Sequence, residues 1–340
     1  GLGDVYKRQI TQHSIILMVG AVVVVFLHNV PYKWFQVFPV FLYPISLVLL
    51  AFVTLMGIIT GDRVNGAARW MTFMGLQFQP SELAKMAVII AVSFILSKRQ
   101  DEEGANPKAF KYIMILTGLV LLLIAPENLS TAMLLFGVVF MMMFIGRVAA
   151  KKLLLLAGGL VLIVALGVGT VVAIPAKTLH NTPGLHRLET WQNRIKGFFD
   201  KDEVPAAKFD IDKDAQIAHA RIAIATSHVV GKGPGNSIQR DFLSQAFSDF
   251  IFAIVIEEMG LIGGIFVVFL YLCLLMRAGR IAQKCERTFP AFLVMGIALL
   301  LVSQAILNMM VAVGLFPVTG QPLPLVSKGG TSTLINCAYI

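Results

Sequence analysis

The feature that most constrains this chain is a succession of long apolar segments separated by short polar loops. Segments of membrane-spanning length occupy residues 14–30, 39–60, 82–97, 112–125, 130–146, 153–174, 250–276 and 289–313, and a last one begins near 331. Crossing the hydrocarbon layer takes about 20 apolar residues in a helix. Because 57% of the residues are hydrophobic and only 14% are charged, unlike a soluble domain, we expect an all-α polytopic membrane protein.

The positive charges are unevenly divided between alternate loops. The basic loops carry Lys33; Lys98, Arg99, Lys108 and Lys111; Arg147, Lys151 and Lys152; and Arg277, Arg280, Lys284 and Arg287. Such loops stay in the cytoplasm, which places the long loop 175–249 on the outer side. The net charge of +9 is spread over these loops and forms no single patch, so we expect no nucleic-acid partner.

The first residues differ from the rest of the chain. Residues 1–13 begin with a short polar stretch, GLGDVYKRQ, and no initiating Met. We treat them as a non-native or remnant segment, and 14–340 as one membrane domain that includes the loop. The predicted orientation puts residue 1 outside, which suggests that an upstream helix is missing.

Candidate chemistry gathers where the long loop meets the next apolar segment. Asp249 lies at this water edge, whereas Glu257 and Glu258 follow inside a run of Ile, Val, Phe and Met. At about 1.5 Å per helical residue they are expected roughly 12 Å deeper than Asp249, where ionisable groups are candidates for function. The simpler interpretation is that Asp249 caps the helix, and the two roles are compatible.

Two more polar stretches border apolar segments. Gln79, Ser81 and Glu82 open a helix in which Glu82 and Lys85 share a face and can pair, either as a local ion pair or as part of a site. Arg69 precedes them and suits phosphate, although an interfacial anchor beside Trp70 is the plainer interpretation.

The second stretch, 317–332, is too rich in Pro and Gly for a regular helix. Irregular backbone at this level must be covered by protein or line a wet cavity, so Thr319, Gln321, Ser327 and Lys328 are candidates to face a polar ligand. A plain outer loop is the alternative.

The loop 175–249 also shows internal order. Ala215 to Val230 has helical spacing, and the glycine run Gly231–Gly235 is expected to end that helix. A phosphate-cradling role for this run lacks the Walker pattern. The three cysteines show no metal or redox spacing.

Together these stretches resemble the SEDS family (shape, elongation, division and sporulation), the peptidoglycan glycosyltransferases typified by FtsW and RodA. The resemblance covers nearly the whole chain. Its motifs are Arg69-Trp70 with Gln79–Lys85 (QPSELAK); Gly231–Ser237 (GKGPGNS); Ser248–Ala253 (SDFIFA) with Glu257–Gly260 (EEMG); and Thr319–Pro324 (TGQPLP) with Ser327–Ser332 (SKGGTS). The wording of 240–249 is nearer to the division branch, FtsW, than to the elongation branch, RodA.

The resemblance implies a SEDS-type bundle of ten helices, of which the first is missing and the last truncated here. It implies polymerisation of lipid II into glycan strands at the outer face of the bacterial inner membrane, during cell division or, in a RodA-type paralogue, elongation. Departures are Gln245, where the family often has Glu, and Asn128, where it often has Asp. An auxiliary carboxylate is therefore excluded at Gln245 and open at Asp241.

The implied reaction is an inverting transfer in which undecaprenyl diphosphate leaves. Because diphosphate leaves without an acid, one base can suffice, and Asp249 is the expected general base. Arg69, Lys85 and Lys328 are candidates to stabilise the diphosphate. The predicted substrate-binding set is Arg69, Gln79, Ser81, Glu82, Lys85, Asp241, Glu257, Glu258, Thr319, Gln321, Ser327 and Lys328.

No cofactor is certain, and no dedicated metal site is predicted, although a divalent cation (Mg or Mn) could share the diphosphate. Expected partners are lipid II, the undecaprenyl-linked glycan strand, a class B penicillin-binding protein and other divisome membrane proteins. A lipid II flippase and a non-catalytic division scaffold are the rival functions, and polymerisation by purified protein separates the enzyme from both.

Overall fold

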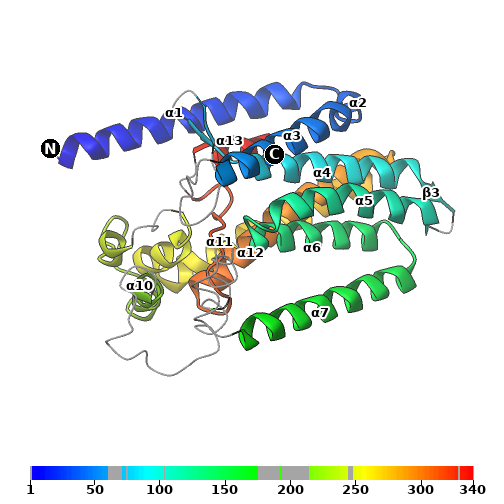
Figure 1. Ribbon diagram of the computed structural model, residues 1–340. Coiled ribbons are helices and arrows are strands. Elements are labelled where there is room, and N and C mark those ends of the chain that lie inside the picture. Colours follow the sequence, from blue (N-terminus) through cyan, green and yellow to red (C-terminus); the bar gives the residue numbers. More distant parts are fainter. Residues whose placement is uncertain are drawn as a thin grey trace.

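The computed structural model describes residues 2–59, 71–73, 76–102, 104–174, 192, 214–243, 248–327 and 330–339. Most of these residues are helical (Figure 1). The main elements are α1 (Leu2–His28), α2 (Tyr32–Phe35), α3 (Phe38–Ile59), α4 (Pro80–Lys98), α5 (Pro107–Ile124), α6 (Leu129–Ile145), α7 (Ala150–Ala173), α10 (Asp214–Ala225), the 3-10 helix η2 (Gln239–Phe242), α11 (Ile251–Lys284), α12 (Thr288–Ala312) and α13 (Gly330–Ala338). Two short antiparallel hairpins, β1–β2 (Met71–Phe73, Leu76–Phe78) and β3–β4 (Gln100–Asp101, Gly104–Ala105), are the described exceptions to all-α structure.

The prediction of a polytopic membrane fold is confirmed. Among the described residues, six helices are long and apolar enough to cross a membrane: α3, α4, α5, α7, α11 and α12. α1 and α6 contain shorter apolar stretches, Ser14–His28 and Leu129–Ile145. Many large apolar side chains on α1, α3, α7 and α11 are exposed, as expected of surfaces that face lipid instead of water.

The first apolar core forms around α4, which is buried along most of its length. α4 packs against α3, α5, α6 and α12, and this core includes Leu50, Val88, Ile113, Leu135 and Leu300. An apolar helix surrounded on several sides has no polar face to offer. The charges near its first turn must therefore find partners inside the protein, whereas Lys98, in its last turn, is exposed.

The second apolar core joins the loop helix α10 to the membrane helices. It includes Ala223 of α10, Phe250 and Ala253 at the start of α11, Ala305 of α12, and Leu323. Thus α10, predicted within 215–230, is confirmed as a helix that packs on the bundle. It ends at Ala225, however, and Thr226–Val230 form turns in which His228 has φ +53°, so the predicted end at Val230 is wrong.

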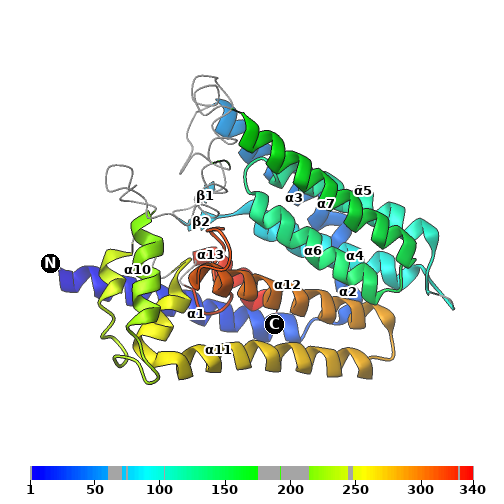
Figure 2. The ribbon, with the colours of Figure 1, turned by 90° about the horizontal axis from the view of Figure 1, so that it is seen from below.

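α11 is broken at Gly260, whose backbone has φ +71° and ψ −171°. The first part, Ile251–Met259, lies beside α10, and the long part lies along α12 (Figure 2). Glycine adopts such a φ without the penalty a side chain brings. The predicted continuous apolar helix 250–276 is therefore wrong at this point, and the short first part, which carries Glu257 and Glu258, is separated from the long part by the break.

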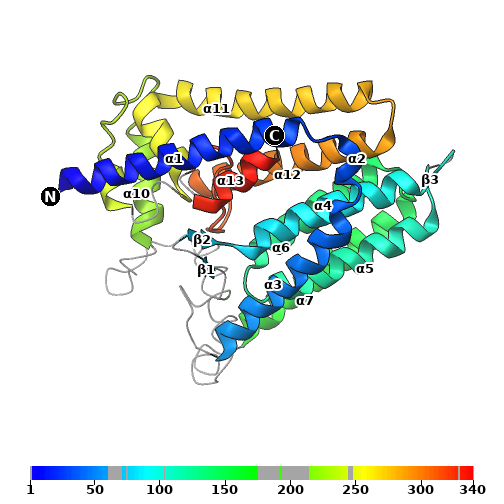
Figure 3. The same ribbon diagram turned by 90° about the horizontal axis from the view of Figure 1, so that it is seen from above.

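The basic loops meet at one end of the bundle, as the charge pattern predicted. Gln100 Nε2 after α4 donates to Gly146 O after α6 at 2.9 Å. The Arg287 guanidinium, after α11, lies 5.9 Å from the ring of Tyr32 in α2. The start of α4, the start of α11 and the end of α12 lie at the opposite end (Figure 3).

Candidate active site

Asp249 lies between the end of the long loop and the first residue of α11. The N-cap position is Phe250, which is buried, and no side-chain bond caps the helix there. Asp249 therefore stands one residue before the N-cap. The position of Asp249 does not support the capping interpretation. Ser248 Oγ donates to Asp249 Oδ1 at 3.0 Å, and Asp249 is only partly buried, so its carboxylate borders solvent.

The main chain around Asp249 is held from two sides. Asn308 of α12 donates through Nδ2 to Asp249 O at 2.9 Å and to Gln321 O at 2.8 Å. Ser327 Oγ donates to Ser248 O at 2.6 Å and accepts from Leu323 N at 2.7 Å. These bonds fix the backbone of the candidate base against the Pro/Gly-rich stretch.

The stretch 317–327 has no regular secondary structure, which confirms the prediction, and protein covers it. Thr319, Gln321 and Ser327 are all buried. Gln321 Nε2 donates to Thr131 Oγ1 at 2.6 Å, and Tyr271 OH donates to Pro324 O. Tyr271 of α11 thus satisfies a backbone carbonyl that no helix satisfies, as buried backbone in a membrane protein requires, and Thr131 of α6 holds the side chain of Gln321.

The predicted ion pair in α4 is present and is fully enclosed. Lys85 Nζ lies 2.8 Å from Glu82 Oε1, and the Lys85 side chain is 0% exposed. Lys85 also donates to Gln304 Oε1 at 2.9 Å, and Gln304 Nε2 donates to Pro322 O at 3.0 Å. The pair is therefore linked through α12 to the same Pro/Gly-rich stretch that contacts Asp249.

Glu257 lies apart from this cluster, in surroundings that differ from the prediction. Its carboxylate contacts the loop residues Lys232, at 2.6 Å, and Ser237, at 2.5 Å, instead of lying deep among Ile, Val, Phe and Met. Gly233 N donates to Glu258 O at 2.8 Å. The glycine run thus contacts both Glu257 and Glu258. Its Lys232 ammonium is already paired with the Glu257 carboxylate.

Other predicted residues take separate places. Gln79 and Ser81 line a cavity of about 20 Å³, large enough for a single water, together with Asn128 and Glu127. Arg69 and Lys328 lie outside the described residues, as does the side chain of Asp241, whose backbone belongs to η2. Their predicted roles stay predictions.

The sequence reasoning missed Gln304, Asn308 and Thr131, which join the predicted stretches. The sequence does contain a signal for Gln304 and Asn308. Gln304 and Asn308 stand four residues apart in the apolar run of α12, hence on one helix face, and polar side chains within a membrane span are expected to have partners. Thr131 had no comparable signal, because a threonine in an apolar helix can bond to its own backbone.

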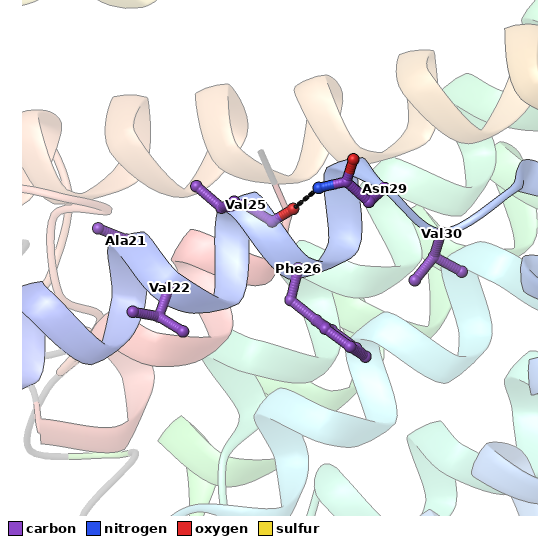
Figure 4. A pocket seen from close by; sticks show the side chains of 6 residues that line it. All are labelled: Ala21, Val22, Val25, Phe26, Asn29 and Val30. Carbon is purple, nitrogen blue, oxygen red and sulfur yellow. Dashed lines mark hydrogen bonds between the residues drawn. The ribbon is translucent and has the colours of Figure 1, made fainter.

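Two further observations concern possible metal and ligand sites. In the described part of the chain no three His, Cys, Asp or Glu side chains are grouped as a metal would need. A shallow apolar hollow of about 600 Å³ lies along α1, lined by Ala21, Val22, Val25, Phe26, Asn29 and Val30 (Figure 4). Asn29 is its polar lining residue and donates to Val25 O at 2.7 Å, so this hollow offers no charged group to a substrate.

Comparison with known protein families shows to which family this chain belongs. The sequence profile of the family described as "Cell cycle protein" (FTSW_RODA_SPOVE) matches residues 3–340. The chain belongs to this family. Its similarity to other FtsW/RodA family members extends over most of their length.

Two curated relatives are each named probable peptidoglycan glycosyltransferase FtsW. The protein of Trichlorobacter lovleyi is 34% identical over 332 residues, which cover 97% of this chain and 80% of the relative. That of Geobacter sp. (strain M18) is 34% identical over 337 residues, covering 98% and 84%. The resemblance inferred from four motifs is thus confirmed, including its leaning toward FtsW.

Solved structures of the family share the architecture. A chain from a structure on the coordination of polymerization and crosslinking by a peptidoglycan synthase complex superposes with a TM-score of 0.75. It is 26% identical, and the match covers 97% of this chain and 87% of that one. The rod shape determining protein RodA of Thermus thermophilus gives 0.64 at 24% identity, covering 97% and 84%, which supports the fold.

Proposed function

We infer that this protein is a peptidoglycan glycosyltransferase that polymerises lipid II into glycan strands, as a member of the FtsW/RodA family. The observation that carries the inference is the convergence of two distant stretches on the backbone at Asp249. Asn308 of α12 and Ser327 of the Pro/Gly-rich stretch bond to the backbone at Ser248 and Asp249. A carboxylate so held, and only partly buried, suits a general base.

In the proposed reaction, Asp249 accepts the proton of the acceptor sugar's 4-hydroxyl as this oxygen attacks the anomeric carbon of the donor. The bond from that carbon to undecaprenyl diphosphate breaks with inversion, and the diphosphate takes the bonding electrons. Glycosidases need a second carboxylic acid to protonate a poor leaving group. Diphosphate leaves as an anion, so cationic help replaces the acid, and Arg69 and Lys328 are the side chains assigned to it.

The buried residues take supporting roles in this proposal. Lys85 is fully enclosed and already paired with Glu82 and Gln304, so we assign it to holding the Pro/Gly-rich stretch and not to direct contact with diphosphate. Gln321 and Ser327 are assigned to the same task. A divalent cation beside the diphosphate is compatible with the reaction, without a cage of protein ligands.

The experiment that tests this function is polymerisation of purified lipid II by the purified protein in detergent, followed by gel analysis of glycan length. We expect strands to form. A flippase would move lipid II across a vesicle membrane and leave it monomeric, and a scaffold would do neither. We propose a class B penicillin-binding protein as the partner, so the assay is run with and without one, and activity that is equal in both arms would argue against that partner.

We also propose that the active end faces outward from the bacterial inner membrane. Cysteines introduced at Asn236 and at Lys284, in a variant without Cys273, Cys285 and Cys337, test the orientation. An impermeant thiol reagent added to intact cells should label position 236 and spare position 284. Labelling of both positions, or of 284 alone, would contradict the orientation.

A further inference from the structure

The carboxylate of Glu257, which is fully enclosed, is the centre of a second polar cluster. Its side chain is 0% exposed. Oε1 accepts from Lys232 Nζ at 2.6 Å and Ile238 N at 3.2 Å, while Oε2 accepts from Ser237 Oγ at 2.5 Å and Gln239 N at 3.3 Å. Four donors from one loop, one of them charged, surround a single anion. We call Glu257 with these four residues the clasp.

Backbone contacts join the same loop to the break in α11. Lys232 N donates to Glu257 O at 2.9 Å, and Leu261 N donates to His228 O at 3.3 Å. The crossing is close: a Cβ on Gly231 would lie 2.3 Å from Gly260 N, and both glycines have positive φ. The broken helix and the loop therefore form one unit, in which the freed backbone groups at the break find partners in the loop.

The clasp stands at one end of a short helix, and Asp249 stands at the other. Ile251–Met259 connects Glu257 directly to Phe250 and Asp249. Glu257 thus holds the helix that follows Asp249, while Asn308 and Ser327 hold Ser248 and Asp249 themselves.

We propose that Glu257 is a positioning residue for the transferase reaction, acting through this short helix on the placement of Asp249. The proposal rests on the proposed function, in which Asp249 is the base. The physical reason for the proposal is that only a carboxylate can accept from all four donors of the clasp. An amide in place of the carboxylate offers one acceptor oxygen and an NH₂ group that cannot accept, so the donors that meet this NH₂ group lose their bonds.

A purely structural role is the competing explanation. Removing one partner of a buried ion pair destabilises a protein whether or not a catalytic group is nearby. The two explanations differ in what happens to the molecules that fold. A structural role lowers only their number, whereas a positioning role lowers the turnover of each one, because a base displaced from its substrate transfers a proton poorly.

The test compares Glu257→Gln and Lys232→Met with the matched controls Glu286→Gln and Lys284→Met, which lie in the exposed basic turn at the far end of α11. Each protein is purified as a monodisperse, folded fraction and assayed for kcat and KM on lipid II. We expect kcat to fall about tenfold for Glu257→Gln and severalfold for Lys232→Met, with KM within about twofold of the unchanged protein in both. Lys232→Arg, which keeps the cation, should retain most of the turnover.

Hydrogen exchange supplies a readout that does not depend on activity. In Glu257→Gln we expect faster exchange within 231–243 and also within 248–253, and in the two controls we expect neither. Faster exchange confined to 231–243, with unchanged kcat, would show a structural clasp and overturn the proposal.

The failures can be told apart. Unchanged kcat in Glu257→Gln, beside an inactive Asp249→Asn, would overturn the positioning role and leave the function standing. Absence of glycan from the unmodified protein would instead remove the proposed function. Hydrogen exchange at 248–253 would then test only whether Glu257 fixes the segment around Asp249. Faster exchange in Glu257→Gln would support this coupling, and unchanged exchange would overturn it.

Discussion

Asp249 and Glu257 lie at opposite ends of the same short helix, and their surroundings differ in accessibility. Asp249 is partly buried and accepts from the neighbouring Ser248. Glu257 is completely enclosed, with four donors from one loop around its two oxygens. A base must reach the proton it removes, whereas both oxygens of the enclosed Glu257 are already occupied by fixed donors. Two acidic residues of one helix are thus suited to different tasks.

The comparison extends to the ion pair of α4. Glu82 and Lys85 are both enclosed, whereas in the clasp Glu257 is enclosed and Lys232 is 27% exposed. Lys85 bonds inward to Gln304 instead of outward to a loop. A charge in such a place is tolerated only with its partner. We therefore expect the largest effects on stability from breaking an enclosed pair, and the largest effects on activity from changing the accessible carboxylate.

Lys85→Met should cause the largest loss of stability. It leaves the Glu82 carboxylate buried without its cation, which costs about 3–5 kcal/mol of unfolding free energy. The double variant Glu82→Gln with Lys85→Met removes both charges and should recover part of the loss. Thermal unfolding in detergent measures both, and a double variant no more stable than the single one would contradict the pairing as the source of the effect.

Asn308→Ala should have an intermediate effect on both stability and activity. It removes the donor to Asp249 O and Gln321 O, and losing the bond to the buried carbonyl of Gln321 costs about 1–3 kcal/mol. We expect turnover of the folded protein to fall as well, by about tenfold, because the backbone of the base loses its anchor. Ser303→Ala in the same helix is the control, and equal turnover in the two variants would show that Asn308 does not position Asp249.

Glu258→Gln should have the smallest effect, although it neighbours Glu257. Glu258 is only partly buried, and its described tie to the loop is the backbone bond from Gly233 N, which the substitution leaves in place. We expect stability within about 0.5 kcal/mol and KM for lipid II within about twofold of the unchanged protein. A tenfold rise in KM would return Glu258 to the substrate-binding residues that the sequence predicted.

The sequence predicted the helices well because hydropathy alone determines which segments can cross a membrane. It also predicted the Glu82–Lys85 pair, since residues three apart in a helix share a face. It failed at Gly260, because a glycine within an apolar run gives no sign of whether the helix continues. The partners of Glu257 were equally hidden: Lys232 and Ser237 are 25 and 20 residues away, and only the fold brings them together.

For the candidate site, too, the sequence predicted the local features but not the contacts between them. Asp249 and the Pro/Gly-rich stretch were predicted as separate features, and their contact through Asn308 required the packing of α11 against α12. Polar residues within apolar helices were the signal to follow, because a buried amide needs partners. Gln304 and Asn308 would have been found by that rule.

The most direct test of the account is the rate of lipid II polymerisation by Asp249→Asn, measured beside the unchanged protein at equal folded concentration. Asparagine keeps the size of the side chain and an oxygen to accept from Ser248, while Asn308 can still bond to the backbone at this position, so unfolding temperature should not change. Loss of the base should lower the rate by about 10²–10⁴-fold. A variant that folds normally and retains more than about half of the rate would contradict the assignment of Asp249 as the base.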